Sequence, residues 1–241
     1  MPGMHLIWVA ATEMATLCHP GQFVMVRTNG GLDPLLRRPL SVHRIAKEYP
    51  TYLALLFSKV GRGTELLAHL RPGESLDILG PLGQGFEIHP DSKNLLLVGG
   101  GMGVAALVAL ADEALEQGKS ITMLLGSRNA ALIYPHALLP PEVELVVATD
   151  DGSAGHYGVV TDLVPRYLDW ADQVFACGPN AMYQKLAEEV RRARSQKPVQ
   201  VLLETSMACG FGVCYGCAVE TRQGMKLVCK DGPKFELRDV F

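Results

Sequence analysis

Four cysteines near the C-terminus constrain this 241-residue chain more than any other feature of its sequence. Cys209, Cys214, Cys217 and Cys229 have the spacing C-x4-C-x2-C-x11-C. A tight loop that supplies three thiolates, closed by a distant fourth, is the plant-type [2Fe–2S] arrangement. Thiolates are the soft ligands that iron–sulfur clusters prefer, and the glycines between these cysteines allow the loop to curl and to turn N–H groups toward cluster sulfurs. We therefore predict a [2Fe–2S] cluster and a protein that transfers electrons.

Two other interpretations of the cysteines remain open. A structural zinc site usually shows two Cys-x-x-Cys-like pairs, whereas this chain has one, preceded by a Cys-x4-Cys spacing. Disulfides need an oxidising compartment, and residues 1–11 show no basic segment or long apolar run typical of a secretion signal. Six cysteines without such a signal favour a cytoplasmic protein.

Composition narrows the class of protein further. The chain is 48% hydrophobic and 20% charged, which is enough apolar material for a core. Its net charge of −3 gives no support for binding to nucleic acid or to an anionic membrane. No stretch of about 18 uninterrupted apolar residues is present, so we expect no membrane-spanning helix.

Three modules are predicted along the chain. Residues 1–90 contain short apolar or alternating runs separated by turn signals, such as 29–31, which is typical of an antiparallel β-barrel. Residues 91–203 alternate between strands and helices, which predicts an α/β domain with a parallel sheet. The cysteine module occupies residues 204–241. The expected strands are 22–27, 40–45, 52–57, 75–79, 94–98, 120–125, 144–148, 173–176 and 199–203, the last of the sheet, and the expected helices are 64–69, 104–117, 160–167 and 180–194.

Three segments carry signals for phosphate binding. Residues 101–106 fit G-x-G-x-x-A after a strand and at a helix start, where glycine permits close backbone approach and the helix N-terminus attracts charge. The acidic residue that usually ends the second strand of an NAD-binding fold is missing at 126–128, so NAD and NADP both remain open. In residues 37–41 an arginine can pair with a phosphate, although a solvated basic pair is the alternative. Residues 61–64 place glycines and a hydroxyl at a helix start.

The order of barrel, nucleotide domain and cluster resembles the ferredoxin–NADP reductase superfamily, whose FAD signature R-x-[YFL]-S is matched by Arg38-Pro39-Leu40-Ser41. Within it, the chain most resembles the family of electron-transfer subunits of type 1B, NAD-dependent dihydroorotate dehydrogenases. The resemblance covers nearly the whole chain and is carried by residues 20–25, 36–41, 61–64, 80–83, 149–155, 176–179, 209–217 and 229–233.

This resemblance implies three cofactors, FAD, a [2Fe–2S] cluster and NAD, and it implies residue roles. Arg38 is expected at the FAD phosphates, with Pro39 and Leu40 along the flavin and Ser41 near its reactive nitrogen. Gly63 and Thr64 are expected at the pyrophosphate. The other implied contacts are Leu56, Phe57 and Ser58 on the ribityl and adenine side, and Gly99, Gly100, Gly101, Gly103, Cys177, Gly178 and Pro179 facing the nicotinamide dinucleotide. Cys177 is equally compatible with simple packing. Hydride transfer needs no side-chain acid or base, so no catalytic residue is predicted.

The resemblance also implies a partner. An FMN-containing catalytic subunit would oxidise dihydroorotate to orotate in pyrimidine (UMP) biosynthesis, in a heterotetramer with two copies of each subunit. Electrons would pass from FMN through the cluster and FAD to NAD+. Two alternatives remain: a related electron-transfer subunit of a sulfide dehydrogenase, bifurcating transhydrogenase or hydrogenase, and a non-enzymatic zinc-bearing adaptor.

Overall fold

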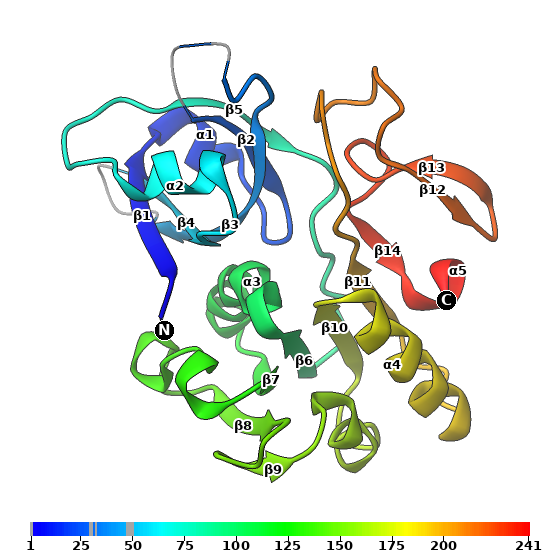
Figure 1. Ribbon diagram of the computed structural model, residues 1–241. Helices are drawn as coiled ribbons and strands as arrows, with labels where there is room; N and C mark the ends of the chain where they lie inside the picture. The colour runs from blue at the N-terminus through cyan, green and yellow to red at the C-terminus, as the bar shows by residue number, and fades with distance from the viewer. Residues whose placement is uncertain (1, 29–30, 32, 47–50) are drawn as a thin grey trace.

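Two large sheets, one antiparallel and one mainly parallel, organise the chain in the computed structural model (Figure 1). The structure describes residues 2–28, 31, 33–46 and 51–241. The turn expected at 29–31 lies outside the described residues except for Gly31. No helix in the described part of the chain is both long enough and apolar enough to cross a membrane.

The N-terminal sheet is antiparallel throughout and forms the predicted β-barrel module. Its strands run in the spatial order β1-β4-β3-β2-β5. One strand, β1, was not among the expected runs. It is an edge strand of this sheet, and from residue 6 on its side chains alternate between exposed and partly buried positions, so one face of the strand is turned to solvent. The elements are β1 Met4–Ala10, α1 Thr12–Leu17, β2 Phe23–Arg27, β3 Arg38–Ala46, β4 Tyr52–Ser58, α2 Arg62–Ala68 and β5 Asp77–Leu82.

The second sheet has seven strands in the order β14-β11-β10-β6-β7-β8-β9. All neighbouring pairs are parallel except β11 with β14. Its strands are β6 Asn94–Gly100, β7 Ser120–Ser127, β8 Glu144–Thr149, β9 His156–Tyr157, β10 Gln173–Cys177, β11 Val199–Leu202 and β14 Lys234–Glu236. Its helical segments are η1 Gly101–Gly103, α3 Val104–Glu116, η2 Ala130–Leu132, η3 His136–Leu138, η4 Val160–Asp162, η5 Val164–Arg166 and α4 Asn180–Arg192.

Two expectations for this sheet were wrong. The helix expected at 160–167 is two 3₁₀ turns, η4 and η5, because Pro165 has no N–H to donate and its ring clashes with the preceding turn. The strand at 199–203 is not the last, since β14 pairs with β11 in antiparallel orientation. Three residues are too short a run to predict as a strand, and the charged Lys234 and Glu236 suit a sheet edge.

The C-terminal module is tied to the parallel sheet through β14. It also contains the hairpin of β12 Ala218–Thr221 and β13 Gly224–Leu227, and the short helix α5 Leu237–Val240. The cysteine loop, residues 209–217 together with Cys229, therefore lies between β11 and β14, two paired strands of this sheet, and the β12–β13 hairpin interrupts it (Figure 1).

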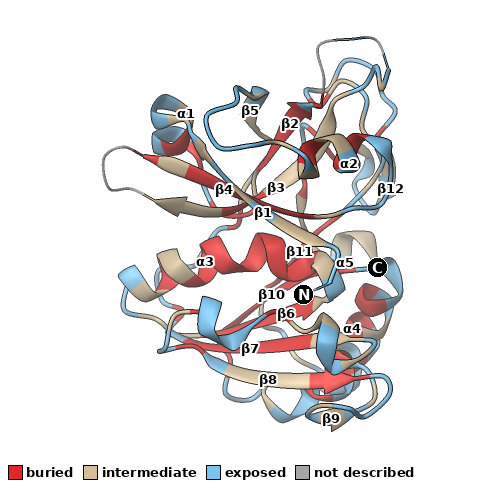
Figure 2. Ribbon diagram, turned by 60° about the vertical axis from the view of Figure 1, so that its left-hand side comes forward, coloured by how far each residue is buried: buried red, intermediate tan, exposed pale blue. Residues whose placement is uncertain are grey.

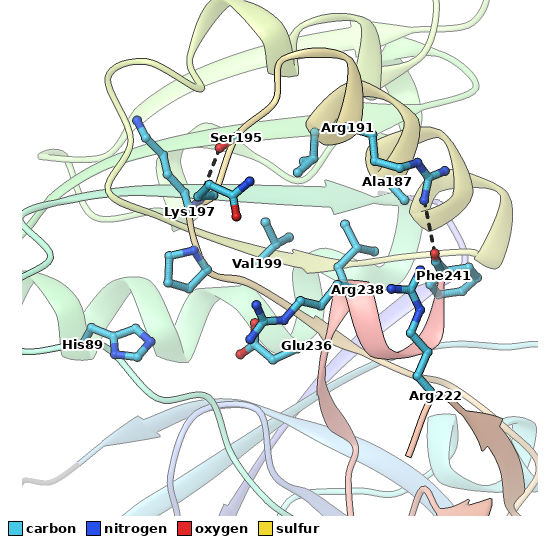
Figure 3. A pocket seen from close by; sticks show the side chains of 14 residues that line it. His89, Ala187, Arg191, Ser195, Lys197, Val199, Arg222, Glu236, Arg238 and Phe241 are labelled. Carbon is cyan, nitrogen blue, oxygen red and sulfur yellow. Dashed lines mark hydrogen bonds between the residues drawn. The ribbon is translucent and has the colours of Figure 1, made fainter. Parts of the chain in front are cut away.

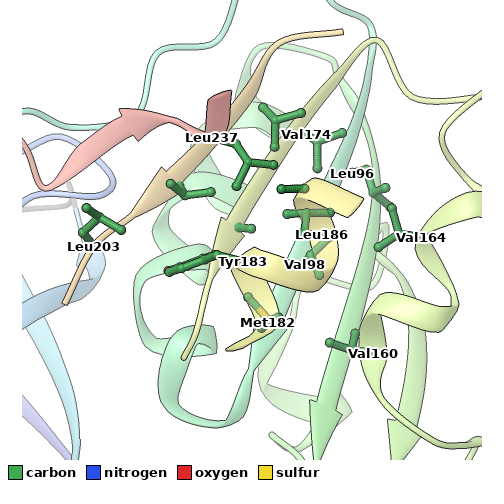
Figure 4. Packing of buried hydrophobic residues seen from close by; sticks show 14 of the residues in the cluster. Leu96, Val98, Val160, Val164, Val174, Met182, Tyr183, Leu186, Leu203 and Leu237 are labelled. Atoms are coloured by element: carbon green, nitrogen blue, oxygen red, sulfur yellow. The ribbon is translucent and has the colours of Figure 1, made fainter. Parts of the chain in front are cut away.

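Helix α3 forms a buried layer between the barrel and the parallel sheet (Figure 2). Strand residues alternate between the two faces of the sheet, as the period of two requires. Leu95 and Leu97 pack toward α3, in a core that also contains Leu56 of the barrel. Leu96 and Val98 pack on the other face against α4 (Figure 4). The barrel thus reaches the nucleotide domain mainly through α3.

Candidate functional site

A cavity of about 350 Å³ lies where the barrel meets the carboxyl ends of β10 and β11. Ligands of open α/β sheets bind at this edge. We call it the barrel–sheet cavity. Its lining is Phe23, Arg38, Pro39, Leu40, Ser41, Leu56, Phe57, Ser58, Val60, Thr64, Met102, Ala105, Cys177, Leu202, Leu203, Glu204, Thr205, Met207 and Pro233.

The structure brings most of the expected FAD-binding side chains into this cavity. Arg38, Pro39, Leu40, Ser41, Leu56, Phe57, Ser58 and Thr64 all line it, and so does Cys177 from the expected nicotinamide set. The expected residues outside its lining are Gly63, Gly99, Gly100, Gly101, Gly103, Gly178 and Pro179. Three strands and one helix start therefore converge on one apolar space with a few polar groups, which is the usual character of a cofactor site.

The two adjacent arginines have different environments. Arg37 donates to the Asp77 carboxylate at 2.8 Å, so its charge is already paired. Among the described residues, Arg38 has no carboxylate partner and bonds only the Leu36 carbonyl. Of the pair, Arg38 is thus the guanidinium available to a phosphate.

The start of α2 packs directly against Arg38. A Cβ at Gly63 would lie 2.5 Å from Arg38 Nε, so a larger residue there would push the guanidinium out of its present position. Thr64 Oγ1 accepts hydrogen bonds from the N–H groups of Val60 and Gly61, at 3.0 and 3.2 Å. This side chain orders the turn before the helix, and the N-terminal end of α2 lies beside the Arg38 guanidinium.

The glycine-rich turn after β6 lies against the end of β10. Cys177 is the register partner of Gly99. A Cβ at Gly103 would lie 1.8 Å from the Cys177 carbonyl oxygen, so the turn can approach β10 this closely only with glycine. Gly100 and Gly178 are also neighbours, and Pro179 packs beside Gly100. The expected nicotinamide-dinucleotide residues therefore form one contiguous edge beside the barrel–sheet cavity.

Sequence reasoning missed several cavity residues, of which Glu204 is the most informative. Its carboxylate lies 4.0 Å from Cys177 Sγ. Although the residue is exposed as a whole, desolvation of the carboxylate raises its pKa. Burial, and then the Glu204 charge, raise the pKa of Cys177 well above its usual range, so its thiol stays protonated. The sequence signal that could have identified Glu204 is its place in the chain, because it follows shortly after β11, at the edge of the sheet formed by the carboxyl ends of the strands.

The four cysteines of the loop form two pairs, and none is in a disulfide. Cys217 Sγ lies 3.2 Å from Cys229 Sγ, and the Cys214 thiol lies close enough to Cys209 to lower the pKa of that thiol. Among the described residues, no three possible metal ligands meet at one point. A tetrahedral zinc ion needs four ligands on one centre, whereas a two-iron cluster takes two cysteines on each iron. The paired arrangement fits the [2Fe–2S] prediction.

Backbone N–H groups point at the cysteine sulfurs. Gly212 N–H donates to Cys229 Sγ at 3.1 Å, and Val213 N–H donates to Cys209 Sγ at 3.4 Å. Burial alone would raise the pKa of Cys209, but N–H groups of the loop and the Cys214 thiol lower it to about 6. Burial, followed by the adjacent Cys217 thiol, raises the pKa of Cys229 to about 12. The donors that surround these thiols can stabilise negative charge on a cluster.

A second cavity, of about 410 Å³, lies at the opposite edge of the sheet near the start of β11 (Figure 3). It contains none of the predicted site residues. Its basic groups are partly engaged: Arg191 donates to the Phe241 carbonyl oxygen at 3.2 Å, and Lys197 donates to the Asp169 carbonyl oxygen at 2.9 Å. The cofactor prediction does not involve this cavity.

The fold and the cysteine loop define an iron–sulfur flavoprotein of the ferredoxin reductase class. Solved structures agree with this class. A chain from the NADH-dependent reduced ferredoxin-NADP oxidoreductase superposes with a TM-score of 0.87 at 32% identity, covering 99% of this chain and 85% of that one. A ferredoxin NADP+ reductase from Neisseria gonorrhoeae shares the fold, with a TM-score of 0.64 at 17% identity over 80% of this chain and 86% of that one.

Sequence comparison gives the family. Residues 204–241 match the model of the iron-sulfur cluster binding domain of dihydroorotate dehydrogenase B. The chain is 37% identical to the dihydroorotate dehydrogenase B (NAD(+)), electron transfer subunit of Desulforamulus reducens, over 97% of this chain and 91% of the relative. It is 40% identical to the subunit of Bacillus caldolyticus, over 92% and 86%. The chain belongs to the family of electron transfer subunits of dihydroorotate dehydrogenase B.

Proposed function

We propose that this chain carries electrons from a dihydroorotate-oxidising subunit to NAD+. One observation carries the proposal: the barrel–sheet cavity and the cysteine loop are continuous. Met207 lines the cavity, and Cys209 follows two residues later. The loop also packs on barrel strand β2, since a Cβ at Gly210 would lie 2.5 Å from Met25 Cγ. A cluster held by this loop would be adjacent to a flavin in the cavity.

We assign the cavity to FAD and the glycine edge to NAD. Arg38 and the start of α2, with Gly63 and Thr64, would bind the FAD phosphates. Pro39, Leu40 and Ser41 would lie along the ring, while Leu56, Phe57 and Ser58 would form the other wall. The nicotinamide dinucleotide would lie on Gly99, Gly100, Gly101, Gly103, Gly178 and Pro179, with Cys177 between the two cofactors.

When bound, FAD supplies exchange between one- and two-electron transfer, and the cluster supplies one-electron transfer. The protein would hold these groups side by side and would limit the access of water to them. The protonated Cys177 thiol and the apolar Leu202 and Leu203 close the inner side of the cavity. No side chain in this arrangement has to accept or give a proton during hydride transfer, so the chain's part is binding and orientation.

The partner we propose is an FMN-containing catalytic subunit that oxidises dihydroorotate to orotate, in the cytoplasm, in a heterotetramer with two copies of each subunit. Support comes from the surface of the cysteine loop. Cys214 is exposed, and Phe211, Val213 and Tyr215 beside it are 52%, 67% and 70% exposed. Exposed apolar side chains around an electron-transfer centre suit contact with another protein.

The runner-up function is a related electron-bifurcating subunit, favoured by the TM-score of 0.87 to the NADH-dependent reduced ferredoxin-NADP oxidoreductase chain. The identity of the partner discriminates between the two. A zinc-bearing adaptor is disfavoured because the cysteine thiols are paired instead of converging on one centre.

Reconstitution tests the proposal. The chain, loaded with FAD and cluster, is mixed with an FMN-containing dihydroorotate dehydrogenase catalytic subunit, and NADH formation is followed after dihydroorotate is added. We expect NADH only when both subunits are present, together with a stable complex on size-exclusion chromatography. Failure to bind that subunit, with binding of a bifurcating-enzyme partner instead, would favour the runner-up.

A further inference from the structure

One buried histidine connects the flavin strand to the nucleotide-binding helix. His43 lies on β3, two residues after Ser41, and is 1% exposed. Its Nδ1 is 2.9 Å from the Ala105 carbonyl oxygen, and its Nε2 is 3.0 Å from the Tyr134 hydroxyl. The Tyr134 ring packs edge-on against the imidazole, with centroids 5.5 Å apart. A single side chain therefore joins three elements from separate parts of the chain.

The hydrogen-bond partners fix the form of the imidazole. A carbonyl oxygen can only accept, so Nδ1 carries the proton and donates to Ala105. Nε2 is then unprotonated and accepts from the Tyr134 hydroxyl. Burial lowers the pKa of His43 to about 4, and the Arg44 charge acts in the same direction. Burial also raises the pKa of Tyr134, so the phenol keeps its proton. The Ala105 carbonyl as acceptor and the Tyr134 hydroxyl as donor are therefore the two partners that a neutral imidazole needs.

The joined elements are those that we assign to the two nucleotides. Ala105 lies in the first turn of α3, directly after the glycine turn, and itself lines the barrel–sheet cavity. Tyr134 follows η2 in the connection from the carboxyl end of β7. Ser41 lines the same cavity from the barrel side. The bond from His43 to Ala105 is thus a direct link between the wall expected to hold flavin and the helix start expected to hold dinucleotide.

We propose that His43, supported by Tyr134, is a positioning residue that sets the distance between nicotinamide and flavin for hydride transfer. This inference rests on the proposed placement of FAD and NAD. Nucleotide contacts on the glycine turn move together with α3, and flavin contacts on β3 move together with the barrel. Loss of the link changes the relation between these two units and leaves each binding surface intact. A misplacement of about 1 Å can cost on the order of a hundredfold in rate.

The test uses two variants of the FAD- and cluster-loaded protein. In His43→Gln the amide oxygen can replace Nε2 as the acceptor for the Tyr134 hydroxyl, but no polar atom occupies the position of Nδ1, so the donor to Ala105 is lost; Tyr134→Phe removes only the hydroxyl. Flavin reduction by NADH is followed by anaerobic stopped flow, and the dissociation constants for NAD+ and FAD are measured separately. We expect the rate at saturating NADH to fall about 10- to 100-fold for His43→Gln and about 3- to 10-fold for Tyr134→Phe. Both dissociation constants should stay within about threefold of the parent.

Asp112→Asn is the matched control. Asp112 accepts two hydrogen bonds from Arg44, at 2.8 and 3.1 Å, and so also joins β3 to α3, but it lies two turns further along the helix. We expect its rate to stay within about threefold of the parent.

Three results would overturn the proposal. The first is a parent-like saturating rate in both the His43 and Tyr134 variants with only a lower melting temperature, which would mark a purely structural pair. The second is an equal loss of rate in Asp112→Asn. The third is a rate loss explained entirely by weaker NAD+ or FAD binding. A parent protein whose flavin is not reduced by NADH would instead refute the proposed function.

Discussion

The cysteine loop and the barrel–sheet cavity adjoin each other but are built in opposite ways. Three of the loop's four sulfurs come from nine consecutive residues, 209–217, and one of them is exposed. The cavity is assembled from strands, a helix start and connections that span residues 23 to 233. A local loop can lose one side chain without affecting the rest of the molecule. A cavity at a junction depends on how whole elements are placed.

The largest expected effect is in the loop. Replacing Cys217 by Ala removes one of the paired thiolates and should abolish the [2Fe–2S] cluster, measured as the loss of iron and acid-labile sulfide and of the electron spin signal of the reduced protein. FAD content should be unchanged if the two sites are built independently. Cys18→Ala serves as the control, because Cys18 is buried in the barrel core away from the loop. One equivalent of zinc without sulfide in the parent would contradict the cluster assignment.

A smaller effect is expected in the cavity. Arg38→Ala removes a charge-assisted contact to phosphate, worth about 1.5–3 kcal/mol, so the dissociation constant for FAD should rise about 10- to 100-fold. The neighbouring Arg37→Ala is the matched control, since Arg37 is already paired with Asp77. Fluorescence titration of the FAD-depleted protein measures both. Equal weakening by the two variants would show that the motif acts through general charge and that Arg38 has no specific contact.

The junction adds a pH dependence that comes from His43. The folded-state pKa of His43, about 4, lies below its ordinary value of 6.5, so the unfolded chain binds a proton first as pH falls. Stability is therefore full above about pH 6.5 and is lost as pH falls toward 4, by about 2 kcal/mol between pH 6.5 and 5. The charged or titratable groups around the ring are Arg44, Tyr134 and Asp112. Urea unfolding of the parent and of His43→Gln measures this difference, and identical pH profiles would contradict it.

The smallest effect is expected for the ion pair beside that histidine. Arg44 and Asp112 are 27% and 29% exposed at their side chains. Asp112→Asn should cost about 0.5–1 kcal/mol of unfolding free energy, less at high salt. A loss of several kcal/mol in urea unfolding would mean that this pair, and not His43, holds the barrel on α3.

The same contrast explains what the sequence could predict. The cysteine spacing and the Arg38–Ser41 motif are local patterns, so both could be recognised along the chain. The three-residue strand β14 gave no such pattern, and Pro165 turned an apparent helix into two 3₁₀ turns. Glu204, His43 and Tyr134 gain their contacts only when β3, α3 and the end of β11 come together. Tertiary placement, which no local spacing encodes, was the missing information.

The central claim is that electrons reach FAD from the partner by way of the cysteine loop. The most direct test is a Cys214→Ala variant that lacks the cluster and retains FAD, measured in two assays. We predict parent-like NADH oxidation with a small artificial acceptor that reaches the flavin directly. With the FMN-containing subunit added, we predict loss of NAD+ reduction by dihydroorotate, while that subunit alone stays active with artificial acceptors. Transfer from dihydroorotate to NAD+ at the parent rate in the cluster-free variant would contradict the account.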